Sequence, residues 1–152
     1  MKKRLCVALS LSLLFSLAAC GGKEEKAAPF SPGDATTLLE SGAFSEALES
    51  IDAETACALY GIDETTVTDA AVYGSTGTTA EELAIFTFTD QDTAQAALTA
   101  LGYRVEDRKD AMADYLPNEV PKLEKAILEQ RENTVLLVVA SDYDPVNEFL
   151  NK

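Results

Sequence analysis

Few residues in the chain combine the types and the spacing that catalysis needs. The 152 residues include no His, which removes every Ser-His, Cys-His and His-metal mechanism. Carboxylates remain as acid–base candidates, and the adjacent pair Glu81-Glu82 stands out. Neighbouring residues of a strand point to opposite faces, so these two side chains are poorly placed to act on one substrate together.

A hydroxyl nucleophile is the second possibility. Ser75, Thr76 and Thr78 lie in a glycine-flanked segment, and a lysine can replace His as the base. The candidate bases are distant in sequence: Lys109, Lys122 and Lys125. Because hairpin-turn chemistry explains the same hydroxyl residues, we predict no catalytic residue. A hydrolase that uses carboxylates or a Ser-Lys pair is kept as an alternative.

Metal ligation has one weak candidate. Asp142-Tyr143-Asp144 is similar to the start of a calcium loop, but Pro145 follows and the required Gly and terminal Glu are missing. We favour a helix start at this position. Zinc-ligand spacing is absent, so the sequence predicts no metal and no cofactor.

Charge is unevenly distributed along the chain. Twelve Lys and Arg residues against 26 Asp and Glu give a net charge of -14, which argues against a nucleic-acid partner. Residues 27–103 contain no Lys or Arg. Such an acidic half suits a basic ligand, weak binding of divalent cations or small ligands, or simply solubility. Its acids are Asp34, Glu40, Glu46, Glu49, Asp52, Glu54, Asp63, Glu64, Asp69, Glu81, Glu82, Asp90 and Asp92.

The first residues have the pattern of an export signal. Basic residues 2–4 precede an uncharged apolar run over residues 5–17, and Leu17-Ala18-Ala19-Cys20-Gly21 looks like a lipobox. We predict a signal peptide over residues 1–19 and lipid attachment at Cys20, although a secretory signal followed by a chance Cys would share these features. The protein would then be anchored in the cell membrane on its extracytoplasmic face. Cys57 would be the last free thiol, and we expect it to be buried and unreactive.

The elements behind these residues indicate an α+β domain. We predict the acylated Cys and a flexible tether over 20–33, then a single domain over 34–152. The order α-α-α-β-β-α-β-β-α places two hairpins in a four-stranded antiparallel sheet. The long helix covers one face, and the short N-terminal helices cover at least part of the other. The expected helices are a first one capped by Asp34 and ending at Gly42, then 44–51, 53–60, a long one from Asp90 or Asp92 to Leu116, and one from Asp144; the expected strands are 67–73, 82–89, 125–131 and 134–140.

Two sets of side chains on these elements receive structural interpretations. Arg104, Arg108 and Lys109 alternate with acids and predict a solvated helix face. Four tyrosines are expected to lie at the edge of the core rather than to form a sugar-binding platform. They are Tyr60, Tyr73, Tyr103 and Tyr115.

Several segments together resemble one lipoprotein domain family of unknown function, DUF4358. They are Leu59–Asp63, Ser75–Gly77, Ala80–Phe86, Arg104–Asp107, Tyr115–Pro117 and Val135–Val138, within a likeness that covers Asp34 to Phe149. The resemblance implies a short acylated envelope protein of an anaerobic Gram-positive bacterium. Because the family has no established activity, it lends no functional residues. One departure is the turn Glu132-Asn133-Thr134, where the family more often has Gly-Asn-aromatic.

These observations favour a membrane-anchored extracytoplasmic lipoprotein that serves as a non-enzymatic binding or accessory module. Its expected partners are the membrane, through lipidated Cys20, and an envelope protein or a basic ligand. Besides the hydrolase, a weak divalent-cation or small-ligand binder that uses the acidic half remains an alternative.

Overall fold

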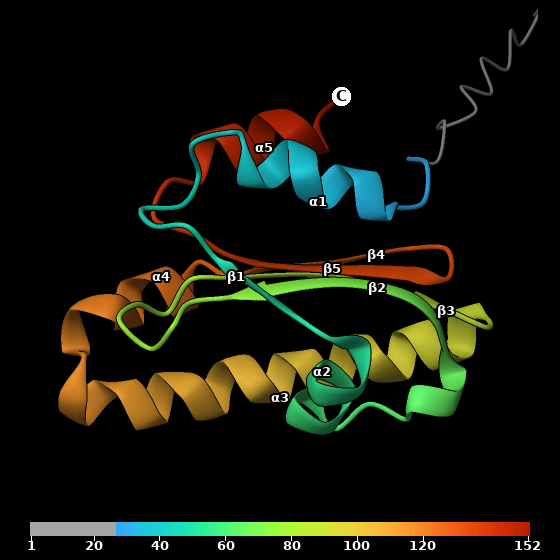
Figure 1. Ribbon diagram of the computed structural model, residues 1–152, viewed down its shortest axis with the longest axis horizontal. Helices are drawn as coiled ribbons and strands as arrows, with labels where there is room; N and C mark the ends of the chain where they lie inside the picture. Colours follow the sequence, from blue (N-terminus) through green and yellow to red (C-terminus); the bar gives the residue numbers. More distant parts are fainter. Residues whose placement is uncertain (1–26) are drawn as a thin grey trace, which may run out of the picture.

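The computed structural model describes residues 27–152 as a sheet between two layers of helices (Figure 1). The predicted signal peptide and Cys20 lie outside the described residues. Within the described range, no helix is both long and apolar enough to span a bilayer.

The sheet has five antiparallel strands in the order β1-β2-β3-β5-β4. Its two innermost strands are β3 and β5, which pair in register from Glu82 opposite Val139 to Thr87 opposite Thr134. Both are nearly continuous apolar runs, as strands covered on both faces must be. The strand bounds are β1 Glu49–Ile51, β2 Val67–Gly74, β3 Glu82–Phe88, β4 Ile127–Arg131 and β5 Thr134–Val139.

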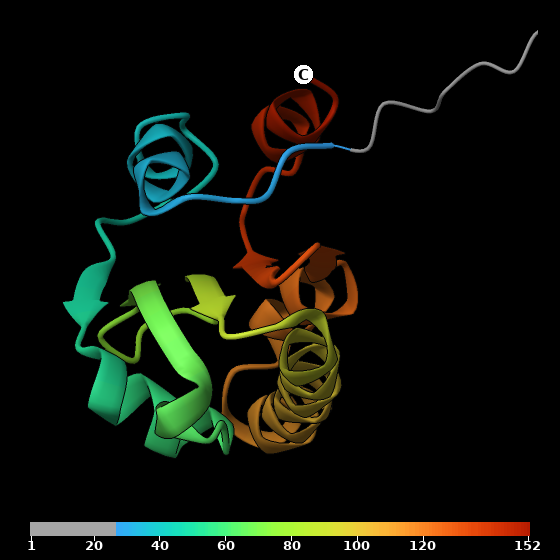
Figure 2. The ribbon, with the colours of Figure 1, turned by 90° about the vertical axis from the view of Figure 1, so that its right-hand side faces the viewer.

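Each face of the sheet has its own helical layer and its own core (Figure 2). One layer contains α1 (Pro32–Leu39) and α5 (Asp144–Leu150), which pack over Leu83 and Ile85. The other contains α2 (Ala53–Tyr60) and α3 (Gln91–Tyr115), which pack over Ala84, Phe86 and Phe88. The alternation of β3 side chains therefore divides the core in two. A short helix, α4 (Val120–Glu124), and two 3-10 turns, Glu64–Thr66 and Pro117–Glu119, complete the fold.

The structure confirms the α+β class and corrects the strand count. The expected four strands become five because the segment 44–51, predicted as a helix, ends in β1. Asp52 caps α2 by accepting a hydrogen bond from Thr55 N at 2.9 Å, which requires an extended backbone just before that helix. Ile51 then lies opposite Val72, where β1 pairs with the outer edge of β2 and Ile51 packs against the core. Tertiary pairing outweighs local helix propensity here.

The domain also begins earlier than Asp34. Ser31 is the N-cap of α1, and Asp34 bonds back to its backbone N–H, so Asp34 completes a capping box rather than starting the helix. Phe30 is buried, its N–H donates to Thr134 Oγ1 at 2.9 Å, and the Arg131 guanidinium lies 4.3 Å from its ring centroid. The last residues of the predicted tether are therefore part of the fold.

Candidate binding site

Glu82, the first residue of β3, has a carboxylate that is only 3% exposed. Tyr60 of α2 donates its hydroxyl to Oε1 at 2.5 Å. Arg104 Nη2 lies 3.0 Å from Oε1, and Arg108 Nη1 lies 2.7 Å from Oε2. Two cations and a hydroxyl thus compensate for the desolvation of one buried charge, which would otherwise be strongly unfavourable.

This arrangement corrects the expectation of a solvated face for Arg104 and Arg108. Both lie on α3, four residues apart, and turn toward the sheet, while Lys109 forms an exposed ion pair with Glu106 as expected of a surface lysine. The Arg104 guanidinium also stacks 4.5 Å from the Tyr60 ring centroid. A sequence signal existed: positions 101, 105, 108 and 112 follow a helical apolar stripe, and position 108 is Arg.

Glu81, the residue before β3, is fully buried and has different partners. Ser45 donates its N–H and its hydroxyl, the latter at 2.7 Å, and Ser141 donates a hydroxyl to the same oxygen. Lys122 of α4 forms an ion pair with it at 3.1 Å. Burial raises the pKa of Glu81, but these hydrogen bonds outweigh burial and hold the pKa below its usual value. The adjacent carboxylates thus bind separate sets of groups, as strand alternation predicts.

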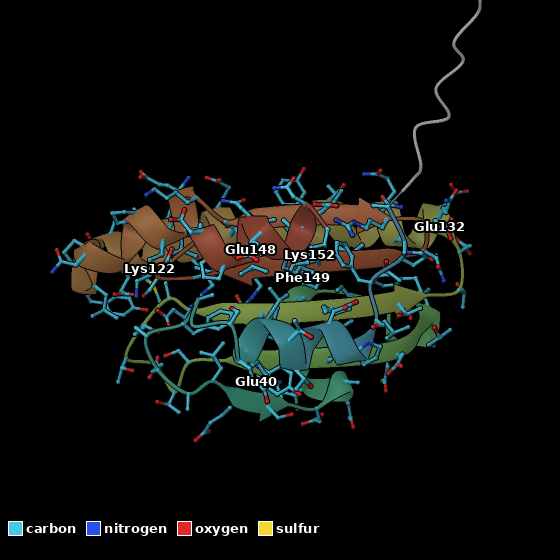
Figure 3. All side chains as sticks on the ribbon, turned by 90° about the horizontal axis from the view of Figure 1, so that it is seen from above. Glu40, Lys122, Glu132, Glu148, Phe149 and Lys152 are labelled. Atoms are coloured by element: carbon cyan, nitrogen blue, oxygen red, sulfur yellow. The ribbon has the colours of Figure 1, made fainter. Side chains whose placement is uncertain are left out.

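The backbone between the two clusters is also tied down. Glu119 accepts from Ala80 N at 2.8 Å and pairs with Lys122 at 2.9 Å, while Arg108 donates to Ala80 O at 3.0 Å. Hydrogen bonds and ion pairs to Arg108 of α3 and Lys122 of α4 therefore hold the start of β3 in place. Lys122 lies toward one end of the long axis of the domain and Glu132 toward the other (Figure 3).

The hydroxyls that sequence singled out act in the turn between β2 and β3. Ser75 Oγ accepts from Gly77 N at 3.2 Å and from Thr79 N at 3.0 Å. Thr78 donates to Glu46 at 2.9 Å. Within residues 27–152, no hydrogen bond joins Ser75 to a lysine.

Several acids of the acidic half serve the fold. Asp52, Asp63 and Asp90 cap helices through side-chain oxygens. Outside that half, the calcium-loop candidate Asp142 accepts from Asp144 N at 2.9 Å in a turn that leads into α5. Among the residues that the structure describes, no group of three or more Cys, Asp or Glu side chains is placed to hold a metal ion.

A trench separates α2 from α3 on the face away from α1 and α5. It consists of two hollows of about 240 and 640 Å³ that share Gly61 and Ala100. The smaller is lined mainly by apolar groups, including Ile62 and Phe88, and the larger contains Arg104. Gly61 ends α2 with a left-handed φ of 67°, so α2 stops early and leaves much of the longer α3 uncovered.

The rim of the trench exposes large side chains. Leu59 is 48% exposed and Tyr103 is 70% exposed, and both line the larger hollow. The expectation of core-edge tyrosines holds for Tyr60, which is buried, but is wrong for Tyr103 and for Tyr115, which is 63% exposed. Exposed Tyr beside Arg is the composition found at binding hot spots.

The fold and the site together define a class of protein: a small helix–sheet–helix domain with an open trench. The chain belongs to the family described as Domain of unknown function (DUF4358), which matches residues 40–140. The match includes all five strands and every trench residue named above. Searches of curated proteins and of solved structures found no match.

Proposed function

We propose that the protein is a lipid-anchored module on the extracytoplasmic face of the cell membrane and that it binds an envelope component without chemical conversion. The observation that carries the binding role is the trench between α2 and α3, where exposed Leu59 and Tyr103 flank two ordered arginines. Isolated exposed apolar residues are ordinary, but apolar and aromatic groups beside fixed donors are typical of a recognition surface.

The place where the described residues begin, Ala27, is compatible with the proposed anchor at Cys20. Ala27 is seven residues after Cys20, a span of at most about 25 Å. The described residues begin on the side of α1 and α5, whereas α2 and α3 lie on the opposite side of the sheet (Figure 1). The trench is lined by residues of α2 and α3. A membrane anchor at the α1–α5 side leaves the trench accessible from outside.

The electrostatics of Glu81 and Lys122 favour binding over the hydrolase alternative. Glu81, with its lowered pKa, is a weak base at neutral pH. Burial lowers the pKa of Lys122, but hydrogen bonds to Glu119 and Glu81 raise it by more, so this ammonium stays protonated. Neither group has the pKa near 7 that would activate Ser141 or Ser45 as a nucleophile.

Site-specific photo-cross-linking in native membranes tests the binding role. A photoreactive residue at Tyr103 lies on the trench rim, and the same residue at Tyr115 is a matched control, exposed on the same helix but outside the trench. We expect a saturable adduct from position 103 alone. Equal adducts from both positions, or none from 103, would refute a trench-centred binding role. Cys20→Ala separately tests the anchor, because it is expected to move the protein out of the membrane fraction.

A further inference from the structure

The chemical character of the trench lining changes from one end to the other. Its α3 wall runs from Thr93 to Ala111, about 27 Å at the helical rise. At the end near Thr93 the lining is apolar apart from Thr side chains and Asp63. Arg104 and Arg108 lie toward the other end.

Some N–H donors of the Arg104 and Arg108 guanidiniums have no acceptor on the described part of the protein. Glu82 and Ala80 accept from Arg104 Nε and Nη2 and from Arg108 Nη1. Among the described residues, every buried side-chain nitrogen or oxygen has a hydrogen-bond partner. The remaining donors, Arg104 Nη1 and Arg108 Nε and Nη2, are therefore accessible to solvent, and both arginines are among the residues that line the larger hollow.

These donors are also preorganised. Glu82 holds both guanidiniums from behind, and Tyr60 supports Arg104 through its ring, so each side chain is only 18–19% exposed. A ligand that meets them has little side-chain entropy left to remove. Two guanidiniums face one buried carboxylate, and Asp107 is the acid among the residues that line the larger hollow. What the arginines offer a ligand is therefore their remaining N–H donors rather than an excess of positive charge.

Building on the binding role proposed above, we propose that the trench binds an amphipathic anion. Its carboxylate or phosphate contacts Arg104 and Arg108, and its apolar part lies toward Ile62 and Phe88. Asp63 repels an anionic head from the opposite end and so fixes the orientation. Charge-assisted contacts to guanidinium are the strong form of hydrogen bond and account for selectivity for an anion.

Two small probes with the same ring system test the head group. 1-Naphthaleneacetate carries a carboxylate, and 1-naphthaleneacetamide replaces it with a neutral amide. Equilibrium dialysis against the full acylated chain in nanodiscs, with empty nanodiscs subtracted, gives both dissociation constants. We expect saturable 1:1 binding of the acetate, about tenfold tighter than the amide, which corresponds to one charge-assisted contact.

Two pairs of variants locate the binding. Asp107→Asn removes the only acid that lines the larger hollow and is expected to tighten acetate binding about threefold. Asp110→Asn makes the same charge change on α3 outside the trench and is expected to leave it unchanged. Ala100→Leu fills the junction of the two hollows and is expected to weaken both probes about tenfold, whereas Thr99→Leu, which faces away, is not.

Any of three results would overturn the proposal. The first is no saturable binding of the acetate up to about 10 mM. The others are equal affinities for acetate and amide, and equal effects of Asp107→Asn and Asp110→Asn on acetate binding. Thermal melts of each variant check that the fold is intact, as expected for three exposed positions and the half-buried Ala100. Equal affinities for the two probes would refute the anion proposal. A saturable cross-link from position 103 would still support the binding role of the trench. The two proposals therefore fail separately.

Discussion

Glu82→Gln is the substitution that most directly tests the buried ion cluster. Gln has the shape of Glu but no charge, and its amide nitrogen would face donors of Arg104, Arg108 or Tyr60. One oxygen still accepts a hydrogen bond, while the other position loses its acceptor. Two guanidiniums that are about four-fifths buried would then lose their ion-pair partner.

The expected loss follows from the burial of the partners. Removing one member of a buried pair costs about 3–5 kcal/mol. Because each arginine is 18–19% exposed, water can solvate part of the uncovered charge, and we expect about 2–3 kcal/mol. For a domain of this size that is a fall in Tm of roughly 6–12 °C.

Urea unfolding followed by circular dichroism at pH 7 measures the effect. Glu106→Gln is the matched control, since it makes the same chemical change at a carboxylate that is 66% exposed and pairs with Lys109 at 2.9 Å. The control is expected to cost about 0.5 kcal/mol or less. If Glu82→Gln destabilises no more than Glu106→Gln, the account of a compensated buried charge is wrong.

Three further predictions concern other groups. The folded pKa of Glu81 lies below its usual 4.5, so its stabilisation is complete above that value and is lost as the pH falls through the folded pKa. Unfolding free energy should therefore fall less steeply below pH 4.5 in Glu81→Gln than in the unchanged protein, and parallel curves would contradict this. Burial, with Glu64 and Asp63 nearby, raises the pKa of the Cys57 thiol, so a thiol reagent at pH 8 should label it only after urea unfolding; fast native labelling would show an accessible thiol. Glu132 adopts a left-handed φ of 52°, so Glu132→Gly should stabilise the protein by about 0.5–1 kcal/mol, with Glu132→Asn between the two, and a lower Tm for the glycine variant would refute the strain argument.

The elements with strong periodicity were predictable from sequence. The long helix was expected from Asp90 or Asp92 to Leu116 and spans Gln91–Tyr115, and the apolar strand expected at 134–140 spans Thr134–Val139. Their patterns extend over enough residues to outweigh local exceptions. The three residues of β1 are too few to show a period, and their conformation depends on pairing with β2, which local sequence does not encode.

The candidate site was harder to predict because its geometry is long-range. Glu82 pairs with arginines 22 and 26 residues away, and adjacent acids or alternating charges usually indicate solvated surface. The trench depends on the early end of α2 at Gly61 relative to the 25 residues of α3, a relation between two helices and not a property of either. The left-handed φ of 52° at Glu132 falls in the turn where the sequence departs from the family pattern, but that departure alone did not predict the backbone conformation.

The buried ion cluster and the trench share Arg104 and Arg108. Glu82 stabilises the packing of α3 on the sheet and at the same time holds the Arg104 and Arg108 donors in place. Apolar residues at positions 82, 104 and 108 together would be compatible with the apolar surroundings of β3, and apolar replacements of complete buried ion pairs are often neutral or stabilising. Stability alone therefore does not account for a buried carboxylate with two arginines. In the proposed binding role, orientation of these guanidiniums toward the open trench would account for it, because fixed guanidinium donors recognise a planar anion better than mobile ones.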